Sequence, residues 1–126
     1  MPLVKKRVTI AAGATSDQIL SGTTYEYVNP GTRIVVAAQD ATGTYEAKTN
    51  LNFTVNNAEF SRDALVSEKV TGEAFGWNGT GYVMNDMVTT GAVRNRPIIQ
   101  FTNTGASSAD IDVAVFIGSQ YWLILR

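Results

Sequence analysis

Short runs of β-branched and aromatic residues recur along the whole chain and constrain its fold more than any other feature. Each run is closed by glycine, asparagine, aspartate or proline. Apolar residues at helical spacing are almost absent from the 126 residues. Short β-rich runs between turn-forming residues are typical of strands rather than helices. We therefore predict an all-β fold.

Two of the runs indicate how their strands are buried. Within a predicted strand at residues 44–56, Leu51, Phe53 and Val55 alternate with asparagine and threonine. This alternation indicates a strand with one buried face and one wet face. The continuous apolar run at residues 34–38 indicates a strand that is buried on both faces.

The remaining predicted strands lie at residues 7–10, 18–20, 23–28, 82–88, 92–102, 111–117 and 120–126. Pro97 cannot donate a ladder hydrogen bond, so it predicts an edge position or a bulge in its strand. Residues 57–70 are left open between a loop or strand and a short helix that begins at Ser61. The whole pattern predicts a single antiparallel β-sandwich domain over residues 1–126, jelly-roll-like, with about eight strands. Residues 1–6 are expected to form a short basic N-terminal arm.

The charge balance limits the kinds of partner. Ten basic and eleven acidic residues leave a formal net charge of −1, which excludes a global attraction to nucleic acid. Charged residues make up only 17% of the chain, below the usual share of about a quarter. Surfaces poor in charge are common where one chain packs against another, and ordinary extracellular sandwiches have them too. The composition therefore favours contact with other chains only weakly.

The residues that most catalytic sites need are missing. The chain contains no histidine and no cysteine, which removes the usual general base, the commonest metal ligand and the Ser–His and Cys–His nucleophile systems. Asp110 and Asp112 would face the same way on a strand, as half of an acid pair or a calcium site or simply as a solvated strand face. We predict a protein that is not an enzyme and that needs no cofactor or metal.

The N-terminal residues bear on location and on nucleic acid. No run reaches the roughly 18 apolar residues of a membrane helix, and residues 1–10 lack the apolar stretch of a secretory signal. We expect no membrane span and synthesis in the cytoplasm. Lys5, Lys6 and Arg7 are candidates for weak, salt-sensitive contacts with phosphates, and the alternative is a solvated terminus.

Aromatic residues suggest a second class of function. A platform for sugar stacking would draw on Tyr25, Tyr27, Tyr45, Phe75, Trp77 and Tyr82, because flat rings bind the apolar faces of sugars. In this alternative the chain is a carbohydrate-binding β-sandwich that uses Trp77, Tyr82 and Asp86 in a loop-borne site. Packing in the core or in an interface is the competing explanation for the same rings.

The last predicted strand is the strongest indication of assembly. Tyr121, Trp122, Leu123 and Leu125 belong to a continuous apolar run. Burying each such side chain contributes roughly 1.5–3 kcal/mol, so we expect them to be buried within the sandwich or against another chain. We predict that these four residues, with Phe75 and Trp77 from a glycine-rich loop, form an interface between copies of the chain.

The strand-rich body, the short basic start and the apolar last strand resemble the small single jelly-roll proteins of viral particles. The resemblance is architectural and covers most of the chain. Residues 98–105 followed by residues 111–115 look like the closing hairpin of many β-sandwiches. The resemblance to these viral proteins implies a non-enzymatic capsid, penton or decoration subunit, located in the virion and made in the host cytoplasm. The implied partners are copies of itself and other virion proteins. A short basic arm gives nucleic acid little support as a further partner.

Overall fold

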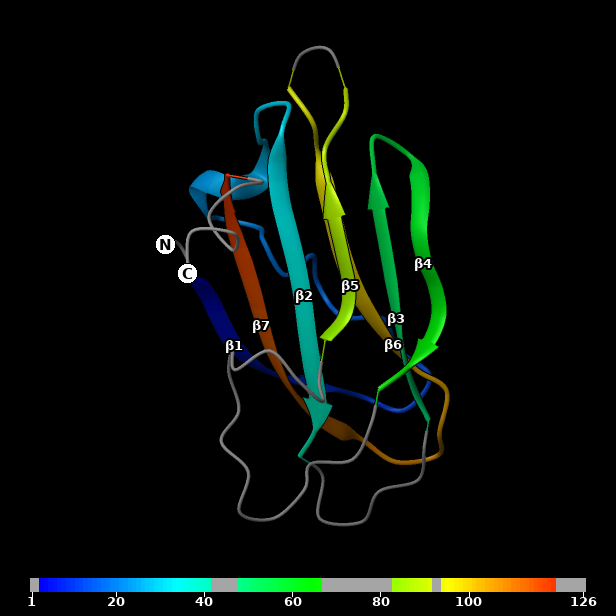
Figure 1. Cartoon of the computed structure of the whole chain (residues 1–126). Helices are drawn as coiled ribbons and strands as arrows, with labels where there is room; N and C mark the ends of the chain where they lie inside the picture. The colour runs from blue at the N-terminus through cyan, green and yellow to red at the C-terminus, as the bar shows by residue number, and fades with distance from the viewer. Residues whose placement is uncertain (1–2, 42–47, 67–82, 92–93, 120–126) are drawn as a thin grey trace.

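In a computed structural model that describes residues 3–41, 48–66, 83–91 and 94–119, two antiparallel sheets face each other (Figure 1). One sheet has the strand order β1-β7-β2-β5 and the other has the order β4-β3-β6. The antiparallel β-sandwich predicted from the sequence is confirmed. The elements of the described residues are β1 (Leu3–Ile10), η1 (Thr24–Glu26), β2 (Thr32–Asp40), β3 (Thr49–Val55), β4 (Ala58–Leu65), β5 (Val83–Val88), β6 (Pro97–Asn103) and β7 (Ala109–Ser119).

An irregular segment at residues 14–19 takes the place of a fourth strand beside β6. The Ser16 backbone N–H donates to the carbonyl of Phe101 at 2.8 Å. The Ile19 backbone N–H donates to the carbonyl of Ile99 at 2.9 Å. This segment lies along the outer edge of β6. Each sheet therefore consists of four extended segments of the chain, side by side.

With this segment counted as the second of eight extended pieces, the two sheets run 1-8-3-6 and 2-7-4-5 in chain order. Successive pieces alternate between the sheets for most of the chain, as in the two interlocked Greek keys of a jelly roll. The first and last described strands, β1 and β7, pair from Leu3 with Phe116 to Ile10 with Ala109. The jelly-roll-like prediction is therefore confirmed.

The core between the sheets comes from the runs that the sequence singled out. Leu51, Phe53 and Val55 are buried, while the alternate side chains of β3 are only partly covered. In β2 every residue from Ile34 to Asp40 is buried. On the face of β2 that points away from the core, Val35 and Ala37 form a second buried cluster with Ala114 and Phe116 of β7. The strand predicted to be buried on both faces is confirmed.

The β3–β4 connection corrects the short helix considered at Ser61. Residues Ala58–Leu65 form a strand instead, joined to β3 by Asn56 and Asn57. These two asparagines have φ values of 50° and 67°, in the left-handed region that a two-residue type I′ hairpin turn requires. Asparagine tolerates this region better than most residues. The Asn-Asn pair was the available hairpin signal, and the prediction missed it.

Two further local predictions are also corrected. The strand expected at residues 23–28 is replaced by the short 3-10 helix η1, which the Thr23 hydroxyl caps by accepting a hydrogen bond from the Tyr25 N–H. The basic arm expected at residues 1–6 is strand from Leu3 onward, because β1 pairs with β7 along its length. Pro97 opens β6 at the edge of the three-stranded sheet, as predicted. No helix in the described ranges is long and apolar enough to cross a bilayer.

Candidate functional site

The residues assigned to assembly from the sequence lie outside the described residues. Tyr121, Trp122, Leu123 and Leu125 follow Ser119, the last residue described. Phe75 and Trp77 fall within residues 67–82, which are also outside, as is Tyr82. Their roles stay predictions.

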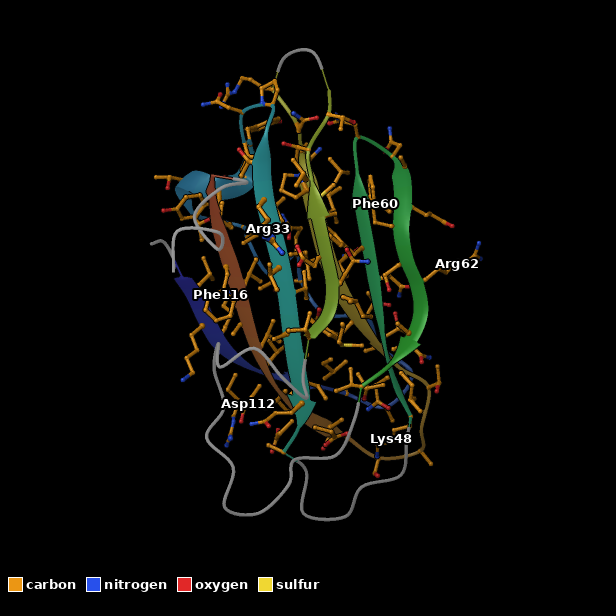
Figure 2. All side chains as sticks on the ribbon, viewed as in Figure 1. Arg33, Lys48, Phe60, Arg62, Asp112 and Phe116 are labelled. Atoms are coloured by element: carbon orange, nitrogen blue, oxygen red, sulfur yellow. The ribbon has the colours of Figure 1, made fainter. Side chains whose placement is uncertain are left out.

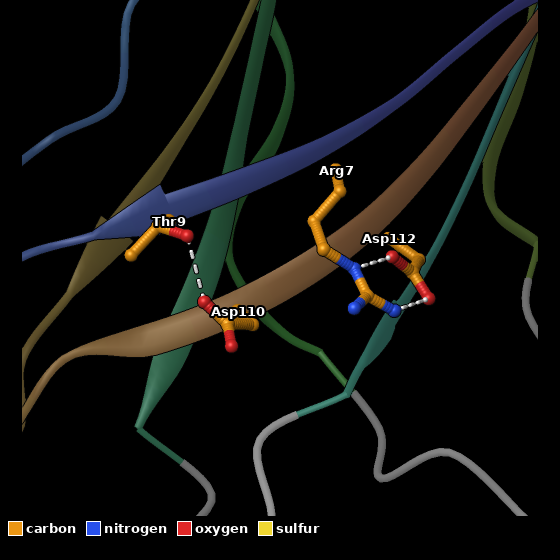
Figure 3. Close-up of polar contacts among 4 residues, drawn as sticks. All are labelled: Arg7, Thr9, Asp110 and Asp112. Carbon is orange, nitrogen blue, oxygen red and sulfur yellow. Dashed lines mark hydrogen bonds and ion pairs between the residues drawn. The ribbon is translucent and has the colours of Figure 1, made fainter.

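Arg7 is engaged within the sheet rather than presented to a partner. Its Nε and an Nη nitrogen donate to the two carboxylate oxygens of Asp112 at 2.6 and 2.9 Å (Figure 3). These hydrogen bonds, and next the negative charge of Asp112, raise the pKa of Arg7 above its ordinary value. This bidentate ion pair ties one edge of the guanidinium to β7 and leaves its other N–H groups for other partners. A contact of Arg7 with nucleic acid stays a prediction.

Lys5 and Lys6 are exposed on β1. Lys6 lines a pocket of about 390 Å³ between β1 and residues 14–19, and Asp17 lines the same pocket. β1 is an edge strand of its sheet, and lysines on such an edge discourage wrong strand pairing. The position of these two lysines is thus explained by protection of an edge, and their contact with nucleic acid stays a prediction.

Asp110 and Asp112 do share one face of β7, as their spacing predicted (Figure 3). Each has its own partner from β1: Asp112 binds Arg7, and Asp110 accepts a hydrogen bond from the Thr9 hydroxyl at 2.7 Å. Within the described ranges, no three histidine, cysteine, aspartate or glutamate side chains come together in a way that could hold a metal ion. The pair joins the first and last described strands.

Asp86, which the carbohydrate alternative placed in a loop, lies on β5 and binds Arg33 of β2. The Arg33 Nε donates to one Asp86 carboxylate oxygen at 2.8 Å, and a guanidinium Nη donates to the other. These hydrogen bonds raise the pKa of Arg33 above its ordinary value. Asp86 therefore belongs to a cross-strand ion pair on the outer face of the four-stranded sheet.

Three large apolar side chains are exposed on β4 and β5, two strands that meet where the two sheets adjoin. Phe60 and Leu65 on β4 are 42% and 48% exposed, and Val83 on β5 is 38% exposed. The two strands come from different sheets and are joined by a hydrogen bond of 3.0 Å from the Asn85 amide to the Phe60 carbonyl. Figure 2 shows Phe60 between β3 and β4, with Arg62 pointing away from the sandwich. We call Phe60, Leu65 and Val83 the β4–β5 strip.

A pocket of about 500 Å³ opens where β2 begins and β7 ends. Its walls include Tyr25 and Tyr27 from the η1 region, Asn29 from the turn before β2, and Arg94 from the segment before β6. The Arg94 guanidinium lies over the Tyr27 ring, 4.7 Å from its centroid. The sequence marked both tyrosines as candidate platform residues, and the structure adds the cationic Arg94 side chain beside them. Nothing local to either stretch indicated that they would meet.

Comparisons of the chain with protein families, with curated proteins and with solved structures found no match.

Proposed function

We propose that the chain is a non-enzymatic structural protein that assembles with copies of itself into a symmetric particle, as a viral capsid or capsid-associated subunit. The jelly roll is a fold on which capsid subunits are built, although it also serves lectins and other proteins. The non-enzymatic part of the proposal rests on the absence of histidine and cysteine from the sequence.

The observation that carries self-assembly is the β4–β5 strip. β4 is an edge strand of eight residues that carries exposed apolar side chains, and such an edge can act as a template for another chain. Register shifts interrupt the pairing of β4 with β3, and such bulges twist an edge away from flat stacking. The edge also carries the ion pair between Arg62 and Glu59. This combination favours a defined contact between subunits over indiscriminate strand addition.

Symmetry follows if every copy presents the same strip. A self-complementary contact would give a dimer, whereas a contact with a different surface would give a ring or a shell. The apolar residues 121–125 supply a second contact in this proposal, as their sequence predicts. Virion proteins of other kinds are further partners, and the location is the virion after synthesis in the host cytoplasm.

The test is the mass of the purified full chain by light scattering after size exclusion, at low and high salt. We expect large species for the natural chain. A variant with Leu65→Lys and Val83→Lys places two charges on the strip and should shift the mass toward that of the monomer. A variant with Ala12→Lys and Ala106→Lys adds the same charge at exposed turn positions and should leave the mass unchanged.

Deletion of residues 121–126 tests the second contact separately. A loss of large species on deletion, with unchanged circular dichroism, supports an interface at these residues. A natural chain that stays monomeric at every concentration and salt overturns self-assembly. Equal loss of mass in the strip variant and in the control would show that added charge, and not the strip, disrupts the particle.

No described residue favours the carbohydrate alternative at its original location. Trp77 and Tyr82 lie outside the described residues, and Asp86 is bound to Arg33.

A further inference from the structure

The pocket beside Tyr27 carries a positive charge in its lining. Among the described residues that line it, Arg94 is the one charged residue, and none is an aspartate or glutamate. In the described parts of the chain, the Arg94 side chain makes its contact with the Tyr27 ring and has no hydrogen bond or ion pair. Its guanidinium N–H groups are therefore available to a ligand, and the sign of the charge favours an anionic group.

The backbone that carries these two side chains is firmly held. The Val28 N–H donates to the Asn95 carbonyl at 2.8 Å, and the Asn95 N–H donates to the Val28 carbonyl at the same distance. This reciprocal pair fixes the neighbours Tyr27 and Arg94 relative to each other. A binding site whose groups are already in place loses less entropy when a ligand arrives.

Asn95 itself is anchored below the pocket. Its side chain is 1% exposed, and its amide oxygen accepts hydrogen bonds from the Asn56 amide at 2.9 Å and from the Gly91 N–H at 3.1 Å. A Cβ atom at Gly91 would lie only 2.2 Å from that oxygen, so glycine is required there. Contacts between the β3–β4 turn and the β5–β6 connection thus support one short segment of the pocket wall.

The opposite rim is held as well. The Asn29 carbonyl accepts hydrogen bonds from the hydroxyls of Thr32 and Thr89, at 2.7 and 2.9 Å. Gly31 has a φ of 80°, as the third residue of a turn that starts with Asn29 and Pro30 requires. The exposed Asn29 side chain is left on the rim as a neutral hydrogen-bonding group.

We propose that this pocket binds a carboxylated sugar, that is, a pyranose that bears a carboxylate, such as a uronic or sialic acid. A volume of about 500 Å³ suits one or two sugar rings. The guanidinium fork of Arg94 matches a carboxylate with two parallel hydrogen bonds. Tyrosine rings supply flat apolar surface for the sugar face, and Thr24 and Asn29 supply neutral partners for hydroxyls.

This inference goes beyond self-assembly and does not depend on it. The ring and the free guanidinium distinguish the ligand from simple anions, because phosphate or sulfate has no apolar face to place against tyrosine. They also distinguish it from neutral sugars, which have no charge to match Arg94. Both distinctions can be measured.

The test is ligand-observed NMR by saturation transfer, with glucuronic acid and N-acetylneuraminic acid as the carboxylated sugars and glucose as the neutral one. We expect millimolar or tighter binding of at least one carboxylated sugar and much weaker binding of glucose. Arg94→Gln should weaken binding of the acidic sugar roughly 10- to 100-fold, as expected when a hydrogen-bonded charge pair is lost. Tyr27→Ala should weaken it as well, because the sugar loses its stacking surface.

Arg96→Gln is the matched control. Arg96 is an exposed arginine two residues further on that does not line the pocket, so its loss should leave binding unchanged. Circular dichroism and thermal unfolding of each variant show whether it is folded. The proposal is overturned if neither acidic sugar binds, if Arg96→Gln weakens binding as much as Arg94→Gln, or if inorganic phosphate displaces the sugar at equal concentration.

Discussion

Asn56 and Asn57 show that neighbouring residues of the same type can have different tasks. Both adopt the left-handed conformation of the β3–β4 turn. The Asn56 side chain in addition accepts a hydrogen bond from the Arg96 N–H at 2.8 Å and donates one to the Asn95 amide oxygen at 2.9 Å. Among the described residues the Asn57 side chain has no hydrogen-bond partner, so its contribution is conformational.

Glycine substitutions separate these two tasks. Asn57→Gly should raise the free energy of unfolding by about 0.5 kcal/mol, because glycine adopts a positive φ without the cost that a Cβ brings. Asn56→Gly should lower it by about 1–3 kcal/mol, because it leaves the Asn95 amide oxygen and the Arg96 N–H with fewer partners. Chemical denaturation of both variants measures the difference. Equal effects would show that the Asn56 side-chain bonds add nothing to stability.

The segment at residues 14–19 shows how an element can do the work of a strand without being one. The Gln18 amide oxygen accepts hydrogen bonds from the backbone N–H groups of Leu20 and Ile99, at 2.9 and 3.1 Å. Its amide nitrogen donates to the Pro97 carbonyl at 3.2 Å. Side-chain groups thus replace part of a backbone ladder along the edge of β6. The short run at residues 18–20 looked β-like in sequence because its apolar residues, Ile19 and Leu20, are buried.

Removal of the Gln18 amide tests how much the stability of β6 depends on residues 14–19. Gln18→Ala should lower the free energy of unfolding by about 1–3 kcal/mol, because the Ile99 N–H loses its side-chain acceptor. Asp17→Ala, at the exposed neighbouring position, should change it by less than about 0.5 kcal/mol. Hydrogen exchange should show faster exchange of the Ile99 amide in the first variant only. Unchanged exchange there would mean that β6 holds its edge unaided.

Regular elements could be predicted from sequence where burial leaves a periodic trace. The alternation in β3 and the apolar run in β2 predicted their strands and their buried faces correctly. β4 has no such trace, because it is an edge strand with exposed Phe60 and Leu65 and an interrupted register. The contact of Tyr27 with Arg94 could not be predicted, because it depends on the pairing of Val28 with Asn95 from a distant part of the chain.

At the scale of the whole molecule, the chain crosses repeatedly from one sheet to the other. β2 lies in the four-stranded sheet, β3 and β4 lie in the other, and β5 returns to the first. Neither sheet can form from consecutive residues alone. The core between the sheets also takes residues from both, so each sheet would expose its apolar face without the other.

Unfolding of the monomeric unit should therefore be a single cooperative transition. Near-ultraviolet and far-ultraviolet circular dichroism should give the same midpoint in urea. The slowest-exchanging amides of β3 and β7 should report the same free energy of opening, although they lie in different sheets. Two separated transitions, or a β3 amide that opens well below the global value, would contradict this interlocking.

The place of β7 between β1 and β2 also governs the order of events during synthesis. A ribosome makes β1 first, yet β1 has no partner strand until residues 109–119 have emerged. The four-stranded sheet therefore cannot close on a partly made chain. If the chain assembles as proposed, and if contact between subunits requires the finished sandwich, a nascent chain is unable to join a particle before β7 has been made.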